Sequence, residues 1–293
     1  MRAVRSLLFV PGHKADWILK ALRSEADGII IDLEDSVPDQ EKGHARANAR
    51  AAILDYPGDK AVLVRPNGLA TEHFGRDLAV VTVPGLDAYL LPMLTGRDDV
   101  VAFDAVITAG ELANGVPRGT VGVVPSFETA AAINRVDEIV TAPRVAGVMA
   151  AAAKDADVSR SIGFRWSAEG LETLYLRSKI VVAARAAGLT NIVVGLWQDV
   201  RDLDGMRTFA RDNAGLGYTG QVLIHPSHAP IANEEYGLSE AQADYYQRLV
   251  AAFEEGRRNG HGAVSFEGEH IDLAHANYAR ERLATAGYEM EAR

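Results

Sequence analysis

Several short apolar runs of the chain end in acidic, basic or imidazole side chains, which are the types that bind metal ions, carboxylates and phosphates. They are Pro11-Gly12-His13-Lys14, Asp32-Leu33-Glu34-Asp35-Ser36, Arg65-Pro66-Asn67, Ser126-Phe127-Glu128-Thr129, the group Lys154, Asp155 and Asp157, and His225-Pro226. Each segment alone has a structural explanation. Together, at one end of a barrel, they would form a carboxylate-lined pocket with cationic groups on its rim.

Glu128 and Asp157 are the best candidates for metal ligands. Cations such as Mg²⁺ are bound by a few carboxylates together with water and ligand oxygens, and carboxylates from two neighbouring strands supply such a half-shell. The alternatives are an acidic residue at a helix N-terminus for Glu128 and a solvated loop acid for Asp157. The chain has no cysteine, so any metal must be bound through oxygen or nitrogen.

Arg65 ends an apolar run, where a charge must be paired or functional. Its planar fork suits a carboxylate or a thioester oxygen, and the alternative is a salt bridge to Asp32 or Glu34. Asp32, Glu34 and Asp35 cannot all lie as bare neighbours. Some of them must pair with arginine, accept backbone N–H groups, hold metal-bound water or cap the following helix.

His13 and Lys14 follow a Pro-Gly turn and could meet a phosphate. His225 could act as a base, but a lone histidine is more often structural, and we interpret it as part of the pocket wall.

Eight apolar runs alternate with amphipathic stretches and must position these residues. The predicted strands are Ser6–Val10, Gly28–Leu33, Ala61–Arg65, Ala88–Pro92, Val121–Pro125, Val145–Ala150, Ile192–Leu196 and Val222–Ile224. The predicted helices between them include Ala15–Ser24, Glu41–Leu54, Phe127–Val140 and Leu171–Ala187. Continuous apolar strands are typical of parallel sheets buried on both faces, and eight of them favour a closed (β/α)₈ TIM barrel over an open doubly wound sheet.

The barrel is expected over residues 1–230, and residues 231–293 exceed what one closing helix needs. Helices are predicted at Glu240–Arg257 and Leu273–Ala286, separated by a polar, glycine-rich break at 256–262. We expect this C-terminal helical extension to pack as a lid on the barrel or on a neighbouring subunit.

Composition narrows the class of protein. The net charge of −10 argues against a nucleic-acid surface, which needs a basic stripe. The N-terminal apolar run is too short for a signal peptide, and no apolar stretch is long enough to cross a membrane. We expect a soluble, cytoplasmic protein.

The order of several segments resembles the citrate lyase β-subunit-like branch of the HpcH/HpaI aldolase family, the acyl-CoA lyases. The matching segments are Arg5–Gly12, Ile31–Val37, Val64–Asn67, Glu128-Thr129, Leu176–Ser178, Ala183–Gly188, Leu216–Gly220 and Ile224–Pro226. The LEDSV and IHP stretches are the most specific. The resemblance covers nearly the whole chain and implies a TIM barrel, dependence on Mg²⁺ (with Mn²⁺ as a substitute) and a homotrimer or trimer-based hexamer.

The resemblance also implies roles for residues. It places the metal glutamate at Glu128, the metal aspartate at Asp157, with Asp155 in reserve, and the substrate-binding arginine at Arg65. An aspartate in a Gly-x-x-Ile-Asp stretch reaches a neighbour's active site in family members with a lid, and here it is Asp272. The pocket residues Arg65, Glu128, Asp32, Glu34, Asp35, His13 and Lys14 would contact the substrate.

Two positions depart from the family pattern. Met93 follows Pro92 where the family usually has lysine, and Lys154 replaces the glycine three residues before the metal aspartate. A lysine beside the metal would replace some positive charge or block the site.

The implied activity is cleavage or formation of a β-hydroxyacyl-CoA such as citramalyl-, malyl- or citryl-CoA, with acetyl-CoA and a 2-oxo acid as the products of cleavage. The metal would polarise the 2-oxo acid portion, Arg65 would stabilise enolate charge and Asp272 would move the proton at carbon. Three alternatives stay open: a malyl-CoA-type thioesterase, a 2-oxo acid aldolase that does not use CoA, and a catalytically lapsed paralogue that binds a ligand.

Overall fold

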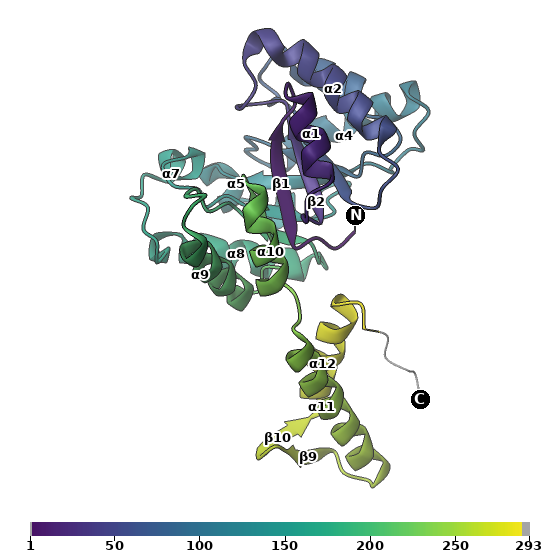
Figure 1. Ribbon diagram of the computed structural model, residues 1–293, viewed down its shortest axis with the longest axis vertical. Helices are drawn as coiled ribbons and strands as arrows, with labels where there is room; N and C mark the ends of the chain where they lie inside the picture. The colour runs from purple at the N-terminus through teal and green to yellow at the C-terminus, as the bar shows by residue number, and fades with distance from the viewer. Residues whose placement is uncertain (1, 289–293) are drawn as a thin grey trace. The chain divides into compact units, whose positions relative to one another are not determined.

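The computed structural model describes residues 2–288 and divides into two compact units, Met1–Tyr236 and Gly237–Arg293 (Figure 1). The first unit ends after α10 (Ala229–Glu235), a helix that contacts β1 and β8 of the barrel. The expected boundary after residue 230 lies inside this helix. Within the described residues, none of the helices combines the length and the apolar character that a membrane crossing requires.

The first unit is a closed barrel of eight parallel strands in sequence order, and the prediction of a TIM barrel is confirmed. The strands are β1 (Ser6–Pro11), β2 (Gly28–Asp32), β3 (Ala61–Arg65), β4 (Ala88–Leu91), β5 (Gly122–Phe127), β6 (Val148–Ala150), β7 (Ile192–Val194) and β8 (Gly220–Leu223). The barrel closes where Ser6–Leu8 of β1 pairs with Gln221–Leu223 of β8.

Both faces of these strands are buried, which explains why the runs are continuously apolar. Every strand contributes to the cluster that fills the barrel interior, which includes Leu7, Ile30, Leu63, Leu90, Val124, Met149, Val193 and Val222, with Ala61 and Ala88 as second contributions from β3 and β4. The side chains that alternate with them, such as Leu8, Ile29 and Val62, pack outward against the helices in a second, larger cluster.

Helices surround the barrel (Figure 1). They are α1 (Ala15–Leu22), α2 (Lys42–Asp55), α3 (Phe74–Val81), α4 (Arg97–Ala113), α5 (Ala130–Asn134), α6 (Val136–Ile139), α7 (Asp157–Ile162), α8 (Leu171–Ala186), α9 (Leu203–Leu216) and α10, with 3₁₀ turns η1 (Asp39–Glu41) and η2 (Pro226–His228).

The predicted helix over Phe127–Val140 is wrong at its start and in its middle. Strand β5 continues to Phe127, because Ser126 and Phe127 pair with Met149 and Ala150 of β6. Thr129 then caps α5 by accepting a hydrogen bond from the Ala132 N–H, and Arg135 interrupts the helix. The strand before Glu128 is therefore longer than its apolar run.

The second unit contains α11 (Glu240–Arg258), a two-stranded hairpin of β9 (Ala263–Phe266) and β10 (Glu269–Asp272), and α12 (Leu273–Thr285). It has its own core of Leu249, Val250, Phe253, Ile271, Ala276 and Ala279. Both helices match the predicted extension. The hairpin was not predicted, because its strands are short and largely exposed, and Glu267 takes the left-handed conformation at its turn.

Candidate active site at the carboxyl ends of the barrel strands

Strands β1, β2 and β3 bring the first polar segments together at their carboxyl ends. Pro11 pairs with Asp32, and Asp32 pairs with Arg65 across the sheet. The Gly12 N–H donates to the Asp32 carbonyl at 2.8 Å. A Cβ atom on Gly12 would lie 2.8 Å from that same carbonyl oxygen, so only glycine allows this close approach.

Arg65 and Asp32 form a bidentate ion pair. Nε and Nη2 of Arg65 donate to the two carboxylate oxygens of Asp32 at 2.7 and 2.8 Å. Asp32 also accepts hydrogen bonds from the backbone N–H groups of Glu34 and Ser36, both at 3.0 Å. Burial alone would raise the pKa of Asp32, but the hydrogen bonds from Arg65 outweigh it and hold the pKa below its usual value. Asp32 therefore orients Arg65.

The third nitrogen of Arg65 is less tightly held. Nη1 lies 3.3 Å from Glu34 and 3.4 Å from Asp35, and the guanidinium carbon lies 4.9 Å from the ring centre of Phe9. Since Nε and Nη2 are occupied by Asp32, Nη1 is the donor that an incoming carboxylate or thioester oxygen would meet.

Glu34 is strongly perturbed by its surroundings. Burial raises its pKa to about 8, because the nearby charge of Arg65 lowers it only in part and the charges of Asp35 and Glu128 raise it further. Glu34 is thus a neutral acid at pH 7 unless a cation approaches. Perturbed groups of this kind cluster at functional sites.

A buried network that the sequence analysis missed supports these loops. The Lys42 ammonium donates to the carbonyls of Leu33 and Glu34 at 2.8 Å each and to Asn67 Oδ1 at 2.7 Å. Asn67 donates in turn to Asp77, which pairs with Arg46 at 3.0 Å. A single sequence offers no signal for Lys42, since it resembles any lysine in the first turn of a helix.

Glu128 lies at the end of β5 and is buried, with 8% of its surface exposed. The Met93 N–H donates to Oε1 at 2.7 Å, and the Ser126 hydroxyl donates to Oε2 at 3.0 Å. Burial raises the pKa of Glu128 despite these two hydrogen bonds, and the charge of Asp157 raises it further. The carboxyl group is held in place by one N–H and one hydroxyl donor rather than by a cation.

Asp157 is the first residue of α7, and its charge is a minor cause of the raised pKa of Glu128. Its Oδ1 pairs with Arg160 at 2.6 Å, and 37% of the side chain is exposed. Asp155, the reserve candidate, is exposed and holds the left-handed conformation at φ 53°. The turn formed by Asp155 positions Asp157.

Met93 and Lys154, the two departures from the family pattern, do not disturb this carboxylate pair. Met93 has φ 51°, and its backbone N–H rather than its side chain contacts Glu128. The Lys154 ammonium lies 5.6 Å from the ring centre of Trp166, in a cation–π contact. Trp166 stands 5.7 Å from Trp197, so the lysine faces an aromatic row.

The three remaining predicted site residues of the barrel have varied surroundings. The Nδ1 atom of His13 is buried with no hydrogen-bond partner among the described residues. Lys14 is exposed at the start of α1. His225 is exposed and bonds Ser227 at 2.7 Å, which holds the turn η2.

Asp272 belongs to the second unit and caps α12. Its Oδ1 accepts a hydrogen bond from the Ala274 N–H at 2.9 Å and lies 2.7 Å from Nδ1 of His275. The hydrogen bonds from His275 hold the pKa of Asp272 below its usual value. A carboxylate of this kind accepts a proton more readily than it donates one at neutral pH.

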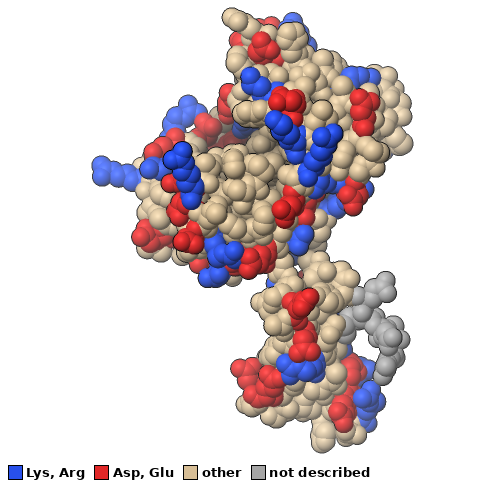
Figure 2. All heavy atoms as spheres, in the orientation of Figure 1, with Lys and Arg blue, Asp and Glu red and all other residues tan. Residues whose placement is uncertain are grey.

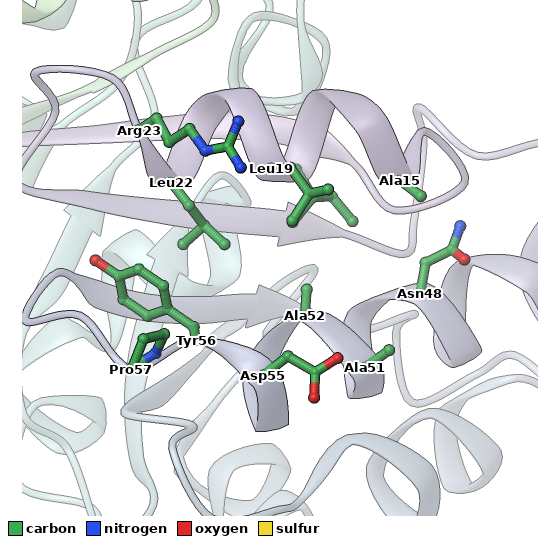
Figure 3. A pocket seen from close by; sticks show the side chains of 11 residues that line it. Ala15, Leu19, Leu22, Arg23, Asn48, Ala51, Ala52, Asp55, Tyr56 and Pro57 are labelled. Carbon is green, nitrogen blue, oxygen red and sulfur yellow. The ribbon is translucent and has the colours of Figure 1, made fainter.

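A separate groove of about 420 Å³ opens on the outer face of the barrel, between α1 and α2 (Figure 3). It is lined by apolar side chains such as Leu19 and Tyr56, with Arg23 and Asp55 at its border. None of the predicted site residues lines it. Acidic and basic side chains are intermingled on the face that Figure 2 shows, without a basic stripe there.

The donor set suits a hard divalent cation. Within residues 2–288, no group of three or more His, Asp or Glu side chains is preassembled as a complete metal cage. Two carboxylates, Glu128 and Asp157, remain, and Mg²⁺ typically uses one or two carboxylates with water and substrate oxygens. Burial is the main cause of the raised pKa values of Glu128 and Glu34, and a cation bound beside them would favour their charged forms.

These features are those of a TIM-barrel enzyme with its candidate site at the carboxyl ends of the strands. The model of the HpcH/HpaI aldolase/citrate lyase family matches residues 5–226. The chain belongs to this family of lyases, as its resemblance predicted.

Known relatives support this assignment over almost the entire chain. It is 33% identical over 284 residues to (3S)-malyl-CoA thioesterase from Cereibacter sphaeroides, covering 96% of this chain and 94% of the relative. It is 33% identical over 288 residues to citrate lyase subunit beta from Escherichia coli, covering 97% and 94%. The solved structure of CitE from Mycobacterium tuberculosis in complex with magnesium, acetoacetate and coenzyme A has a TM-score of 0.75, 28% identity and coverage of 97% and 98%.

Proposed function

We propose that this protein is a Mg²⁺-dependent carbon–carbon lyase that cleaves or forms a β-hydroxyacyl-CoA such as citramalyl-, malyl- or citryl-CoA. The products of cleavage are acetyl-CoA and a 2-oxo acid. The observation that carries the proposal is an arginine oriented by Asp32, Arg65, at the same end of the barrel as the buried carboxyl group of Glu128, whose hydrogen-bond partners are Met93 and Ser126 rather than a cation. The CitE complex with magnesium, acetoacetate and coenzyme A supports this substrate class.

Glu128 and Asp157 would hold the metal, with Mn²⁺ as a possible substitute. When bound, the cation polarises the oxygen of the 2-oxo acid portion as a Lewis acid. Met93 and Ser126 fix both oxygens of Glu128, so this ligand needs little reorganisation. Asp157 would turn one oxygen away from Arg160.

The remaining residues bind and move charge. Arg65 stabilises the negative oxygen that develops on the thioester as the bond breaks, because Asp32 holds its guanidinium in a fixed plane. Asp272, from its own or a neighbouring subunit, exchanges the proton at the enolate carbon, and its lowered pKa keeps it ionised at neutral pH, which is the form that a base needs.

Product analysis tests this function. We expect purified protein with Mg²⁺ to convert citramalyl-, malyl- or citryl-CoA to acetyl-CoA and pyruvate, glyoxylate or oxaloacetate. Chelation of the metal should stop the reaction. Failure to cleave any of the three esters, with Mg²⁺ binding absent by calorimetry, would instead identify a lapsed paralogue.

A malyl-CoA thioesterase is the second candidate, favoured by the likeness to (3S)-malyl-CoA thioesterase. The same product analysis separates the two, because a thioesterase releases free CoA with intact malate. A titration with CoA distinguishes an aldolase that uses free hydroxy-oxo acids. We further propose a cytoplasmic homotrimer or hexamer, which cell fractionation and sedimentation would check.

A further inference from the structure

Lys154 lies midway along the segment that connects β6 to the proposed metal ligand Asp157. This segment begins beside Glu128, because the Ala151 N–H donates to the carbonyl of Phe127, the last residue of β5, at 3.3 Å. Lys154 is three residues from Ala151 and three residues from Asp157. Three residues span at most about 11 Å, so the backbone of Lys154 stays close to the candidate site at the carboxyl ends of β5 and β6.

Contacts with two neighbouring loops hold this lysine in place. Its backbone N–H donates to Oε1 of Gln198, in the loop after β7, at 2.5 Å. Its ammonium lies 5.6 Å from the ring centre of Trp166, in the loop before α8. The loops after β6 and β7 also pack directly against each other, since a Cβ atom on Gly195 would lie 2.7 Å from the nitrogen of Ala152. Both the backbone and the ammonium of the lysine are therefore positioned.

The ammonium of this lysine carries an unpaired charge. Within residues 2–288 no carboxylate forms an ion pair with it, although two acids lie within three positions along the chain. Asp157 pairs instead with Arg160 at 2.6 Å, and Asp155 is exposed in the left-handed conformation. Arg65, by contrast, is already paired with Asp32. An ammonium has three N–H donors, so its contact with an aromatic ring leaves donors for an anion.

The three esters of the proposed function differ at one position, the carbon that carries the hydroxyl group. Its substituent is hydrogen in malyl-CoA, methyl in citramalyl-CoA and carboxymethyl in citryl-CoA. In each ester the hydroxyl and its adjacent carboxylate face the proposed metal site, and the thioester oxygen faces Arg65. Citryl-CoA alone has a second free carboxylate. This group needs a cation of its own, because an unpaired charge enclosed in a site costs free energy.

We propose that Lys154 is a specificity-determining residue that selects a 2-oxo acid with a second carboxylate, so that the protein favours citryl-CoA over citramalyl-CoA and malyl-CoA. This inference rests on the function proposed above. The substituent on the hydroxyl-bearing carbon is next to the atoms that face Asp157, and the loop of Lys154 leads directly to Asp157. The ammonium forms a charge-assisted hydrogen bond with the second carboxylate, and the Trp166 ring keeps it off the metal ligands.

Turnover of two esters tests the inference. We expect kcat/KM of the wild type for citryl-CoA to exceed that for citramalyl-CoA by about tenfold or more. Lys154→Gln should lower the value for citryl-CoA by about tenfold or more, mainly through KM, and that for citramalyl-CoA by less than about threefold. Lys154→Arg keeps the charge and should keep the preference. The matched control is Lys20→Gln on α1, where the lysine is exposed and pairs with Asp16, and it should change neither value.

Calorimetry separates this inference from the lyase function, because it needs no turnover. With Mg²⁺ present, freshly dissolved oxaloacetate should bind the wild type about tenfold or more tightly than pyruvate does, whereas Lys154→Gln should bind the two acids alike. This result in a protein that cleaves none of the esters would keep the role of Lys154 and reject the lyase function.

Three results overturn the role of Lys154. One is an unchanged preference for oxaloacetate or citryl-CoA in Lys154→Gln. Another is an equal loss with both esters, which would place the lysine on a part of the substrate that the esters share, such as a CoA phosphate. The third is a wild type that does not bind oxaloacetate more tightly than pyruvate.

Discussion

The carboxyl groups on the two sides of the candidate site have pKa values shifted in opposite directions. On the β2–β3 side, Asp32 is fully engaged by Arg65 and its pKa is lowered. On the β5–β6 side, Glu128 has only the Met93 N–H and the Ser126 hydroxyl as hydrogen-bond partners, and its pKa is raised. Glu34, in the loop after β2, also has a raised pKa, of about 8, mainly because it is buried.

This difference divides the work of the site. The neutralised pair is a rigid device for presenting one guanidinium nitrogen to a substrate oxygen. The β5–β6 side suits a bound cation. A buried carboxylate without a cationic partner costs free energy, and a bound metal would recover it. A site with both sides neutralised would orient a substrate but would not attract the metal.

The largest expected effect comes from removing Glu128, the proposed metal ligand on the β5–β6 side. Glu128→Ala should lower metal-dependent kcat/KM by about 10³-fold or more, because the cation and the charge it stabilises are both lost. Steady-state kinetics across a Mg²⁺ titration would measure this. Glu128→Gln keeps the shape and the side-chain oxygen but not the charge, and it should be nearly as inactive.

The control for this prediction is Asp137→Ala, which removes an exposed acid from α6 and should leave kcat/KM unchanged. Full activity of Glu128→Ala in the presence of a chelator would refute the assignment of the metal to this side.

The second prediction breaks the neutralised side. Arg65→Met leaves Asp32 buried without its partner, which should destabilise the fold by about 3 kcal/mol and remove most of the activity. The double variant Arg65→Met/Asp32→Asn should recover much of the stability but none of the activity, because the guanidinium is still absent. Urea denaturation and turnover assays on the same preparations would separate the two effects.

Arg76→Met is the matched control, since Arg76 pairs with Glu72 at the surface with 63% of its side chain exposed. It should change stability by less than about 0.5 kcal/mol. Equal stability losses in the single and double variants would show that Arg65 acts through packing rather than through its charge.

The third prediction uses pH to compare the two sides in metal-free protein. The folded-state pKa of Glu34 is raised from 4.5 to about 8, so the folded state keeps a proton that the unfolded state has lost. The free energy of unfolding should therefore fall as pH rises from about 4.5 to 8, by up to about 5 kcal/mol at about 1.4 kcal/mol per unit of pKa shift. Denaturation with urea at pH 5 and pH 8 in a chelator would measure it, and Glu34→Gln should lack this slope.

Asp32 should show the opposite sign. Its folded-state pKa lies below 3.8, so its stabilising contribution is present above that pH and is lost as pH falls through the folded-state pKa. Asp32→Asn should reduce the loss of stability in acid while leaving the slope between pH 5 and 8 intact. The same slope in wild type and Glu34→Gln would contradict the assignment of the raised pKa to Glu34.

The sequence predicted the barrel because its strands are apolar on both faces, a pattern that needs no knowledge of distant contacts. It left two choices for Arg65, a substrate oxygen or a salt bridge to Asp32 or Glu34. The structure shows the salt bridge, with two nitrogens on Asp32 and the third near Glu34 and Asp35, and the role in substrate binding stays a prediction. The sequence could not predict the hydrogen bonds that hold the site residues in place. The bonds of Lys42 to Asn67 and of Met93 to Glu128 join residues 25 and 35 positions apart. Such pairs depend on strand register, and the residue types alone do not predict these contacts.

The smallest expected effect concerns Lys154. If its ammonium reached the proposed metal ligands, it would neutralise their charge and remove the difference between the two sides of the site. Because that ammonium lies over the Trp166 ring, Lys154→Gln should change Mg²⁺ affinity by less than about threefold. The loss of an exposed cation–π contact should cost only about 0.5–1 kcal/mol of stability. Calorimetric titration with Mg²⁺ tests this, with Trp166→Leu as the partner variant that releases the lysine. Metal binding more than tenfold tighter in Lys154→Gln would show that the lysine already neutralises Glu128 and Asp157. The contrast between the two sides of the site would then be smaller than the pKa shifts indicate.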